Sequence, residues 1–272
     1  MELARTTWLI TGASAGIGAA LARVAAREGA SHLVLVARRG ERLEALAAEL
    51  TTGRVGLRVT VVPVDLATDE GRRALLERLT REGVEVDVLV NNAGVGAHGL
   101  FDEIPPERTR QMVELNVVAL TELSAALVPG MVRRRRGGVV NVSSVVGLMP
   151  VPSMAVYAAT KAYVTSLSDA MAAELHSGGV TVVCVHPGPT TTEFQGVADP
   201  QGRRRTKAPA PFFQSAEQVA EAAVAGLRRG RVRVNPGVNQ VVSSLARLMP
   251  APLARALGRR MARQERARGR PG

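Results

Sequence analysis

Apolar runs of strand length alternate along the chain with longer stretches in which apolar residues recur at helical spacing. The apolar runs are rich in Val and cover residues 7–10, 33–36, 58–64, 86–90, 139–142 and 180–185, with 231–234 as a seventh candidate. The helical stretches between them include residues 19–28, 41–50, 69–82 and 155–176. Strands that are apolar on both faces and alternate with helices predict an α/β fold: one doubly wound parallel sheet of about seven strands with helices on both faces. The carboxyl ends of the strands would then share one edge, where ligands bind in such folds.

Length and loops predict how the chain is organised. A chain of 272 residues suits a single α/β domain, and we find neither an internal repeat nor a linker. We therefore expect one catalytic domain over residues 1–250 and a basic helix or tail over 251–272. Residues 189–214 form a long irregular stretch after the sixth strand, which predicts a lid over the ligand edge.

Composition narrows the class of protein. Hydrophobic residues make up 46% of the chain and aromatic residues only 3%, which predicts a core of aliphatic side chains. We find no signal-peptide pattern and no apolar run of membrane-spanning length. The single cysteine, Cys184, lies in an apolar strand, where a small buried side chain is expected. These features favour a reducing cytoplasm.

The net charge of +11 is concentrated in two places. One is the Arg-rich C-terminus after residue 250, and the other is the loop 203–207. Because the rest is nearly neutral and few aromatic residues could stack on bases, we expect no nucleic-acid partner. The basic tail could contact a membrane, but packing over the ligand cleft or a partner subunit is favoured. The loop, with Arg203, Arg204, Arg205 and Lys207, could receive a CoA or phosphopantetheine phosphate, or it could be a solvated surface.

A Gly-rich turn, Gly12-Ala-Ser-Ala-Gly16-Ile-Gly18, follows the first strand and opens a helix. Glycine permits the tight turn and the close approach of a pyrophosphate, which the free N–H groups of the helix N-terminus can bind. In this strand-turn-helix context, the turn predicts a Rossmann-type dinucleotide site. Its expected cofactor contacts are Gly12, Ser14, Ala15, Gly16, Ile17 and Gly18.

The ends of the second and third strands bear on the choice of cofactor. The second strand ends in Ala37-Arg38-Arg39, with no carboxylate to accept from the ribose of NAD. Guanidinium groups bind a phosphate dianion through charge-assisted bonds, so NADP(H) is preferred over NAD(H), with Arg38 as the discriminating residue. The alternative is that both arginines are solvated. Asp65, followed by Leu66, could accept from the adenine amino group or cap the helix that begins near residue 69.

The chemistry is indicated by Tyr157-Ala-Ala-Thr-Lys161, which places a phenol and an ammonium on one helix face. A nearby ammonium lowers the pKa of a phenol, which can then exchange a proton with a carbonyl or alcohol oxygen. Ser144 follows the fifth strand at the ligand edge, where a hydroxyl can hold the substrate oxygen. Taken alone, the Tyr-Lys spacing is also typical of a surface Tyr packed over a Lys stem.

In combination, these motifs resemble the short-chain dehydrogenase/reductase family over residues 5–235. The resemblance is carried, in family order, by Thr11-Gly12 with Gly16-Ile17-Gly18, Asn91-Asn92-Ala93-Gly94, Asn116, Ser144, Tyr157 with Lys161, and Pro187-Gly188 with Thr192. It implies an NAD(P)-dependent oxidoreductase acting on CH–OH and C=O groups, and a homodimer or homotetramer.

The resemblance also implies residue roles. Tyr157 would be the acid/base, and Lys161 would lower its pKa and bind the nicotinamide ribose. Ser144 would polarise the carbonyl, and Asn116 would hold a water in a proton relay. Further cofactor contacts are implied for Tyr157, Lys161, Asn92, Ala93, Gly94, Pro187, Gly188, Thr190 and Thr192.

The segment between Ser144 and the tyrosine helix, residues 145–154, carries no charge. With Phe194, Phe212 and Phe213 of the expected lid it indicates an apolar substrate, unless these side chains only pack the lid. The expected substrate contacts are Ser144, Met149, Met154 and Tyr157. The prediction is NADPH-dependent reduction of a lipophilic ketone or aldehyde, or the reverse oxidation, without a metal. The alternatives are a catalytically silent NADP-binding regulatory module and a reductase of an acyl-carrier- or CoA-bound ketone.

Overall fold

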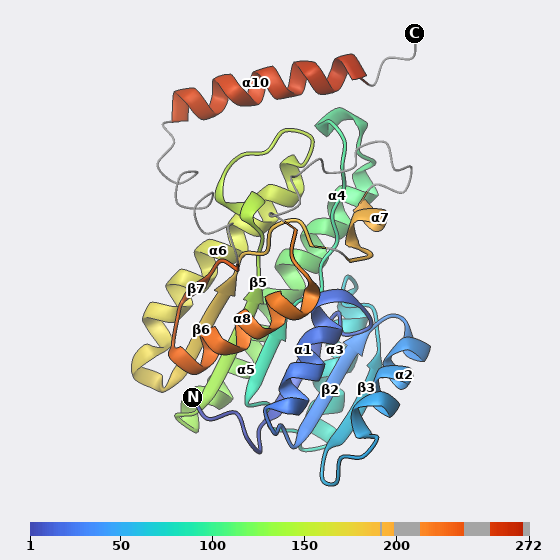
Figure 1. Ribbon diagram of the computed structural model, residues 1–272, viewed down its shortest axis with the longest axis vertical. Helices are drawn as coiled ribbons and strands as arrows, with labels where there is room; N and C mark the ends of the chain where they lie inside the picture. Colours follow the sequence, from blue (N-terminus) through green and yellow to red (C-terminus); the bar gives the residue numbers. More distant parts are fainter. Residues whose placement is uncertain (191, 199–212, 237–250, 269–272) are drawn as a thin grey trace.

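Seven strands form one parallel sheet in the computed structural model, which describes residues 1–190, 192–198, 213–236 and 251–268 (Figure 1). The strand order is β3-β2-β1-β4-β5-β6-β7, and every pair of neighbours is parallel. The strands are β1 (Thr7–Thr11), β2 (His32–Ala37), β3 (Arg58–Pro63), β4 (Val88–Asn91), β5 (Gly137–Val142), β6 (Val180–Val185) and β7 (Arg233–Val234). The predicted doubly wound α/β fold is therefore confirmed.

Helices cover both faces of the sheet and bury its aliphatic side chains (Figure 1). One face packs against α1 (Gly16–Arg27), α2 (Gly40–Thr51) and α8 (Ala216–Arg229). The other face packs against α3 (Asp69–Arg81), α5 (Leu120–Arg133) and α6 (Ala155–Leu175). Cys184 of β6 is buried as expected. Strands covered on both sides explain why the apolar runs showed no alternation.

Shorter elements surround the carboxyl ends of the strands. They are η1 (Phe101–Glu103), α4 (Pro106–Val113), the π-helical turn η2 (Glu114–Ala119), η3 (Val145–Leu148), η4 (His176–Gly178) and α7 (Phe194–Ala198). Of the expected lid 189–214, the structure describes only the beginning and the end, with α7 near the beginning. The basic loop 203–207 and Phe212 lie outside the described residues.

One helical stretch among the described residues, Pro106–Arg133, has the length and apolar composition of a membrane-spanning helix, with a mean hydropathy of 1.6. This differs from the expectation that no run is long enough. The stretch packs against α3, α6 and β5. Core helices of ordinary domains have the same composition, so this feature alone is weak evidence for a membrane.

The helix that follows β3 is capped by Thr68, whose hydroxyl accepts from the Gly71 N–H at 3.1 Å. The alternative that Asp65 caps this helix is therefore wrong. The Asp65 carboxylate accepts instead from the Ala67 N–H at 2.9 Å and lines the ligand cleft. This local bond holds the carboxylate at the end of β3.

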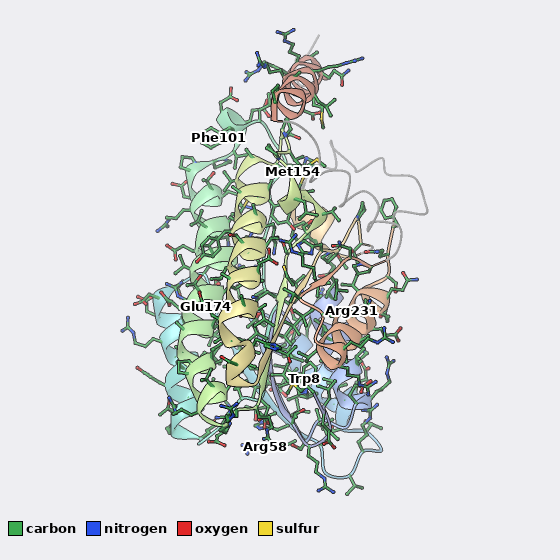
Figure 2. All side chains as sticks on the ribbon, turned by 90° about the vertical axis from the view of Figure 1, so that its left-hand side faces the viewer. Trp8, Arg58, Phe101, Met154, Glu174 and Arg231 are labelled. Atoms are coloured by element: carbon green, nitrogen blue, oxygen red, sulfur yellow. The ribbon has the colours of Figure 1, made fainter. Side chains whose placement is uncertain are left out.

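The C-terminal helix α10 (Ala251–Arg268) lies across the end of the molecule toward which the strands point (Figure 1). Arg266 donates from both terminal nitrogens to the two carboxylate oxygens of Asp102 in η1, each at 3.1 Å. Phe101 and Met154 lie at this same end, whereas Trp8 and Arg58 lie toward the other (Figure 2). The predicted basic helix thus contacts the body of the protein beside the ligand edge.

Candidate active site

A cleft of about 1780 Å³ opens at the carboxyl ends of the strands. Its walls come from the turns after β1 to β6, from α6 and from α10. The expected cofactor residues that line it are Gly12, Ser14, Ala15, Gly16, Ile17, Arg38, Arg39, Asp65, Leu66, Asn92, Ala93, Gly94, Tyr157, Lys161, Pro187, Gly188, Thr190 and Thr192. Residues scattered over the sequence therefore meet in one cavity large enough for a dinucleotide and a substrate.

Three of the expected site residues do not line the cleft: Gly18, Asn116 and Met149. A Cβ at Gly18 would lie 2.3 Å from the Gly12 carbonyl oxygen, so this glycine lets α1 pack against the turn that precedes it. Met149 lies beyond the cleft wall, because η3 ends before it. Asn116 is 1% exposed and lies one layer behind the wall.

The Gly-rich turn has the conformation that a pyrophosphate site needs. Gly12 and Gly16 have φ values of +68° and +55°, which side chains rarely adopt. The amide of Asn92 donates to the Thr11 carbonyl at 2.9 Å and holds the turn against the end of β4. The α1 N-cap, Ala15, makes no side-chain capping bond, so the first N–H groups of α1 are available to an anion.

A cluster of hydrogen-bond donors lies beside this turn at the start of α2. Arg39 donates to the Ser14 hydroxyl from Nε (3.2 Å) and Nη2 (3.0 Å), and to Glu193 at 2.7 Å. Arg42 donates to the other Glu193 oxygen at 2.6 Å. We call Ser14, Arg39 and Arg42 the arginine cradle. Arg38, the expected discriminating residue, lies outside this cluster and pairs with Asp65 at 3.7 Å. Like Arg39 it lines the cleft, whereas Arg42 does not.

Arg42 was missed in the sequence because no motif marks it. A usable signal was present, since a third arginine follows Arg39 by three positions at the start of a helix and so shares its face.

Tyr157 and Lys161 lie on the buried face of α6, with the phenol in the cleft wall. Lys161 Nζ lies 5.8 Å from the centre of the Tyr157 ring and donates to the Val142 carbonyl at 2.8 Å. Burial lowers the pKa of Lys161 to about 8. Burial also raises the pKa of Tyr157, and a hydrogen bond with Ser144 offsets only part of that rise. Burial therefore shifts the phenol pKa in the direction opposite to the lowering that was expected from Lys161.

The register between Ser144 and α6 is set by close packing. Ser144 caps η3, and a Cβ at Gly147 of η3 would lie 2.6 Å from the carbonyl carbon of Lys161. The Ser143 hydroxyl donates to the Lys161 carbonyl at 2.8 Å. Gly147 was also missed by sequence reasoning, since nothing local shows that another backbone approaches it.

Asn116 lies in the π-helical turn η2 and is fully used in hydrogen bonding. Its Oδ1 accepts from the Val95 N–H at 2.9 Å, and its Nδ2 donates to the Val95 carbonyl at 2.9 Å and to Thr160 at 3.1 Å. A Cβ at Gly94 would lie 3.1 Å from Asn116 Oδ1 and 3.4 Å from Lys161 Nζ. Asn116 thus holds the segment after β4, Gly94 and Val95, which lies between Asn116 and Lys161.

The end of the cleft beyond Tyr157 is largely apolar. The Phe194 ring packs on the Tyr157 ring with centroids 5.4 Å apart, and Val95, Val146 and Met154 join the same cluster. Met261 and Glu265 of α10 complete the lining, and sequence reasoning did not single them out. Phe213 does not line the cleft. Within the described ranges, no group of three or more His, Cys, Asp or Glu side chains is placed to hold a metal ion.

Comparison with known proteins agrees with this geometry. The short chain dehydrogenase family model matches residues 6–202. An oxidoreductase of Myxococcus xanthus is 33% identical over 264 residues, which cover 96% of this chain and 99% of that protein.

Two solved structures show the same fold. A short-chain dehydrogenase from Sphingobium yanoikuyae in complex with NADPH has a TM-score of 0.78 at 35% identity, covering 98% of this chain and 96% of that one. A bulky-bulky ketone specific alcohol dehydrogenase from Comamonas testosteroni has a TM-score of 0.74 at 31% identity, covering 90% and 95%. The chain belongs to the short-chain dehydrogenase/reductase family and is an NAD(P)-dependent oxidoreductase that acts on CH–OH and C=O groups.

Proposed function

We propose that this enzyme reduces a lipophilic ketone or aldehyde to an alcohol with NADPH. The observation that carries the proposal is the buried Tyr157 phenol in the cleft wall, hydrogen-bonded to Ser144, close to Lys161 and facing an apolar pocket. The catalytic unit is residues 1–250, and α10 of the segment 251–272 completes the pocket through Met261 and Glu265.

The cleft-lining turns that follow β1 to β4 would hold NADPH, which would supply a hydride for the carbonyl carbon of the substrate. The Ser144 hydroxyl donates to the substrate oxygen as negative charge develops on it. Tyr157 transfers its proton to that oxygen, and the ammonium of Lys161 stabilises the phenolate that remains. Asn116 acts from behind the wall, because its bonds to Val95 hold the strand end next to Lys161.

The preference for NADP(H) rests on the arginine cradle. Two guanidinium groups and a hydroxyl at the end of β2 form the donor set that suits a phosphate dianion. Carboxylates at this edge would favour the ribose hydroxyls of NAD instead, and Asp65 is paired with Arg38. We therefore assign the 2′-phosphate to Arg39 and Arg42, and Arg38 remains a cofactor contact in the cleft lining.

A lipophilic substrate is supported by the side chains beyond Tyr157. Val146, Met154 and Phe194 line that end of the cleft. Met261 of α10 is part of the cleft lining, as are the carboxylates of Glu103 and Glu265. The similar protein from Comamonas testosteroni is a bulky-bulky ketone specific alcohol dehydrogenase. The proposed substrate contacts are Ser144, Met154 and Tyr157.

The test is consumption of NADPH and of NADH with a panel of bulky lipophilic ketones and aldehydes. Tyr157→Phe is expected to lower kcat by about a thousandfold, because general acid catalysis contributes about a hundred- to ten-thousandfold. Tyr163→Phe is the matched control, since Tyr163 lies on the same helix, is 39% exposed and contacts Thr121 instead of the cleft. Retained turnover in Tyr157→Phe, or equal turnover with NADH, would contradict the proposal.

A further inference from the structure

Glu193 occupies the arginine cradle in the structure. Its two carboxylate oxygens accept from different arginines, Arg39 at 2.7 Å and Arg42 at 2.6 Å. Arg39 meanwhile keeps its remaining donors on the Ser14 hydroxyl. Both arginines lower the pKa of the Glu193 carboxyl, chiefly through these hydrogen bonds, so the group is an anion at neutral pH.

The local backbone directs this carboxylate toward the cradle. Glu193 lies between Thr192 and Phe194, and the Phe194 N–H donates to the Thr192 hydroxyl at 3.4 Å, which closes a short turn. The methyl group of Thr192 lies 3.1 Å from where a Cβ on Gly16 would be, so the turn rests on the pyrophosphate loop. Phe194 on the other side packs on Tyr157. Both neighbours hold Glu193 at the edge of the cleft.

A carboxylate held by two guanidinium groups has the donor set of a bound phosphate. The 2′-phosphate of NADP(H) and the Glu193 carboxylate therefore need the same donors, and two anions sharing one cradle repel each other. NAD(H) carries a neutral hydroxyl at that position and has no such conflict.

We propose that Glu193 is a built-in competitor for the 2′-phosphate, and that it determines how strongly the enzyme distinguishes NADP(H) from NAD(H). The inference rests on the proposed NADP(H) preference and adds a residue that limits it. On binding, the cofactor phosphate takes the Arg39 and Arg42 donors from Glu193, whose side chain is 51% exposed and can turn to water. Removing the charge of Glu193 should then strengthen the binding only of ligands that carry a 2′-phosphate.

The experiment is calorimetric titration of the full chain with adenosine 2′,5′-bisphosphate and with adenosine 5′-monophosphate, which differ by the 2′-phosphate. Glu193→Gln keeps the shape of the side chain and removes its charge. It is expected to tighten the bisphosphate about tenfold, because each exposed ion pair contributes up to about fivefold. The Kd of the monophosphate should change less than about twofold. In the same way, NADPH should bind more tightly to Glu193→Gln while the binding of NADH should stay nearly unchanged.

Glu49→Gln is the matched control. Glu49 accepts from Arg23 at 2.7 Å and is also 51% exposed, but this pair joins α1 to α2 away from the cleft. It should leave both ligands unchanged. Arg42→Gln should weaken the bisphosphate selectively.

The outcomes separate the inference from the function on which it rests. If Glu193→Gln weakens the bisphosphate, the residue orients the arginines and the competition is refuted. Glu193 is also no competitor if Glu193→Gln binds both ligands more tightly by the same factor, or if it changes the affinity for neither. In either case the NADP(H) preference stands as long as the wild type binds the bisphosphate more tightly. If the wild type binds both ligands equally and Arg42→Gln changes neither, the preference itself fails.

Discussion

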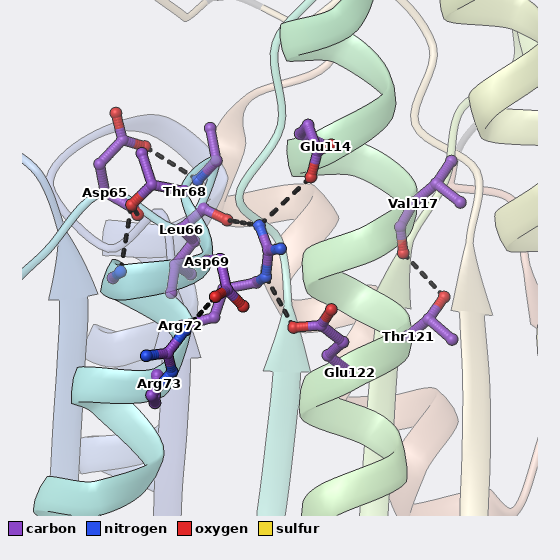
Figure 3. Close-up of polar contacts among 12 residues, drawn as sticks. Asp65, Leu66, Thr68, Asp69, Arg72, Arg73, Glu114, Val117, Thr121 and Glu122 are labelled. Atoms are coloured by element: carbon purple, nitrogen blue, oxygen red, sulfur yellow. Dashed lines mark hydrogen bonds and ion pairs between the residues drawn. The ribbon is translucent and has the colours of Figure 1, made fainter.

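Arg72 is a buried cation that holds Leu66 in the wall of the cleft. It is 5% exposed on α3, and its Nη1 donates to the Leu66 carbonyl at 3.2 Å (Figure 3). Nε donates to Glu122 at 2.7 Å and Nη1 reaches Glu114 at 3.4 Å, so one side chain joins α3 to η2 and α5. Because Leu66 lines the cleft, we predict that Arg72→Met destabilises the protein and loosens the site for adenine.

The expected loss of stability can be worked out from the groups that lose their hydrogen-bond partner in Arg72→Met. Removing one member of a buried ion pair costs about 3–5 kcal/mol. The side chains of Glu114 and Glu122 are 34% and 44% exposed, so water compensates part of the loss and about 2 kcal/mol remains. The Leu66 carbonyl, left without its donor, adds about 1 kcal/mol. A total of about 3 kcal/mol lowers the Tm by about 6–12 °C in a domain of this size.

The assay is urea and thermal unfolding followed by circular dichroism, with Arg73→Met as the control. Arg73 is the next residue of α3 and pairs with Asp69, but both side chains are about 60% exposed, so its removal should change the free energy of unfolding by less than about 0.5 kcal/mol. Combining Arg72→Met with Glu122→Gln should cost less than the sum of the single changes. Equal losses from the two arginines, or strict additivity in the double variant, would refute the reasoning.

Four further predictions concern Lys161 and the surroundings of the cleft. Burial lowers the pKa of Lys161 to about 8, so kcat/KM for reduction should fall as the pH rises through about 8 and the ammonium is lost. The unfolded chain keeps that proton up to about 10.5, so Lys161 makes the protein more stable as pH rises between these values, and Lys161→Met should remove that slope in urea titrations at several pH values. Gly147→Ala should push η3 off α6 and lower kcat more than it changes the cofactor Kd, and an unchanged kcat would show that the contact is not tight. Arg266→Gln should raise the KM for bulky ketones and leave NADPH affinity unchanged, because its bond to Asp102 holds only the substrate end, and an equal change in both would contradict this.

The strands could be predicted because burial on both faces leaves an uninterrupted apolar run. Their ends could not, because pairing with neighbours decides them. The run 86–90 predicted a strand that in fact covers Val88–Asn91. Asp87 lies beside its start, where its carboxylate accepts from the Thr7 N–H at 3.0 Å and from Arg136 at 2.9 Å. Those partners lie far along the chain, so the sequence near Asp87 gives no sign of them.

The proposed catalytic pair, Tyr157 and Lys161, could be singled out because the two residues lie one helical turn apart and because the surrounding motifs resemble the family's. The arginine cradle could be predicted only in part, because Glu193 reaches Arg39 from 154 positions away. Burial shifts the pKa of Tyr157 upward, opposite to the lowering that was expected from the neighbouring Lys161. The sequence shows that a charge is near a phenol, but only the fold shows how much water is removed from both.

The burial of Tyr157 and Lys161 affects reduction and oxidation differently. It raises the pKa of Tyr157 and lowers that of Lys161, so both shifts favour the neutral forms. Reduction uses the protonated phenol, which burial favours, whereas oxidation uses the phenolate, which burial disfavours. The arrangement therefore requires less electrostatic work to begin reduction. Oxidation of the alcohol should gain rate with rising pH until Lys161 loses its proton near pH 8, where the charge that stabilises the phenolate disappears.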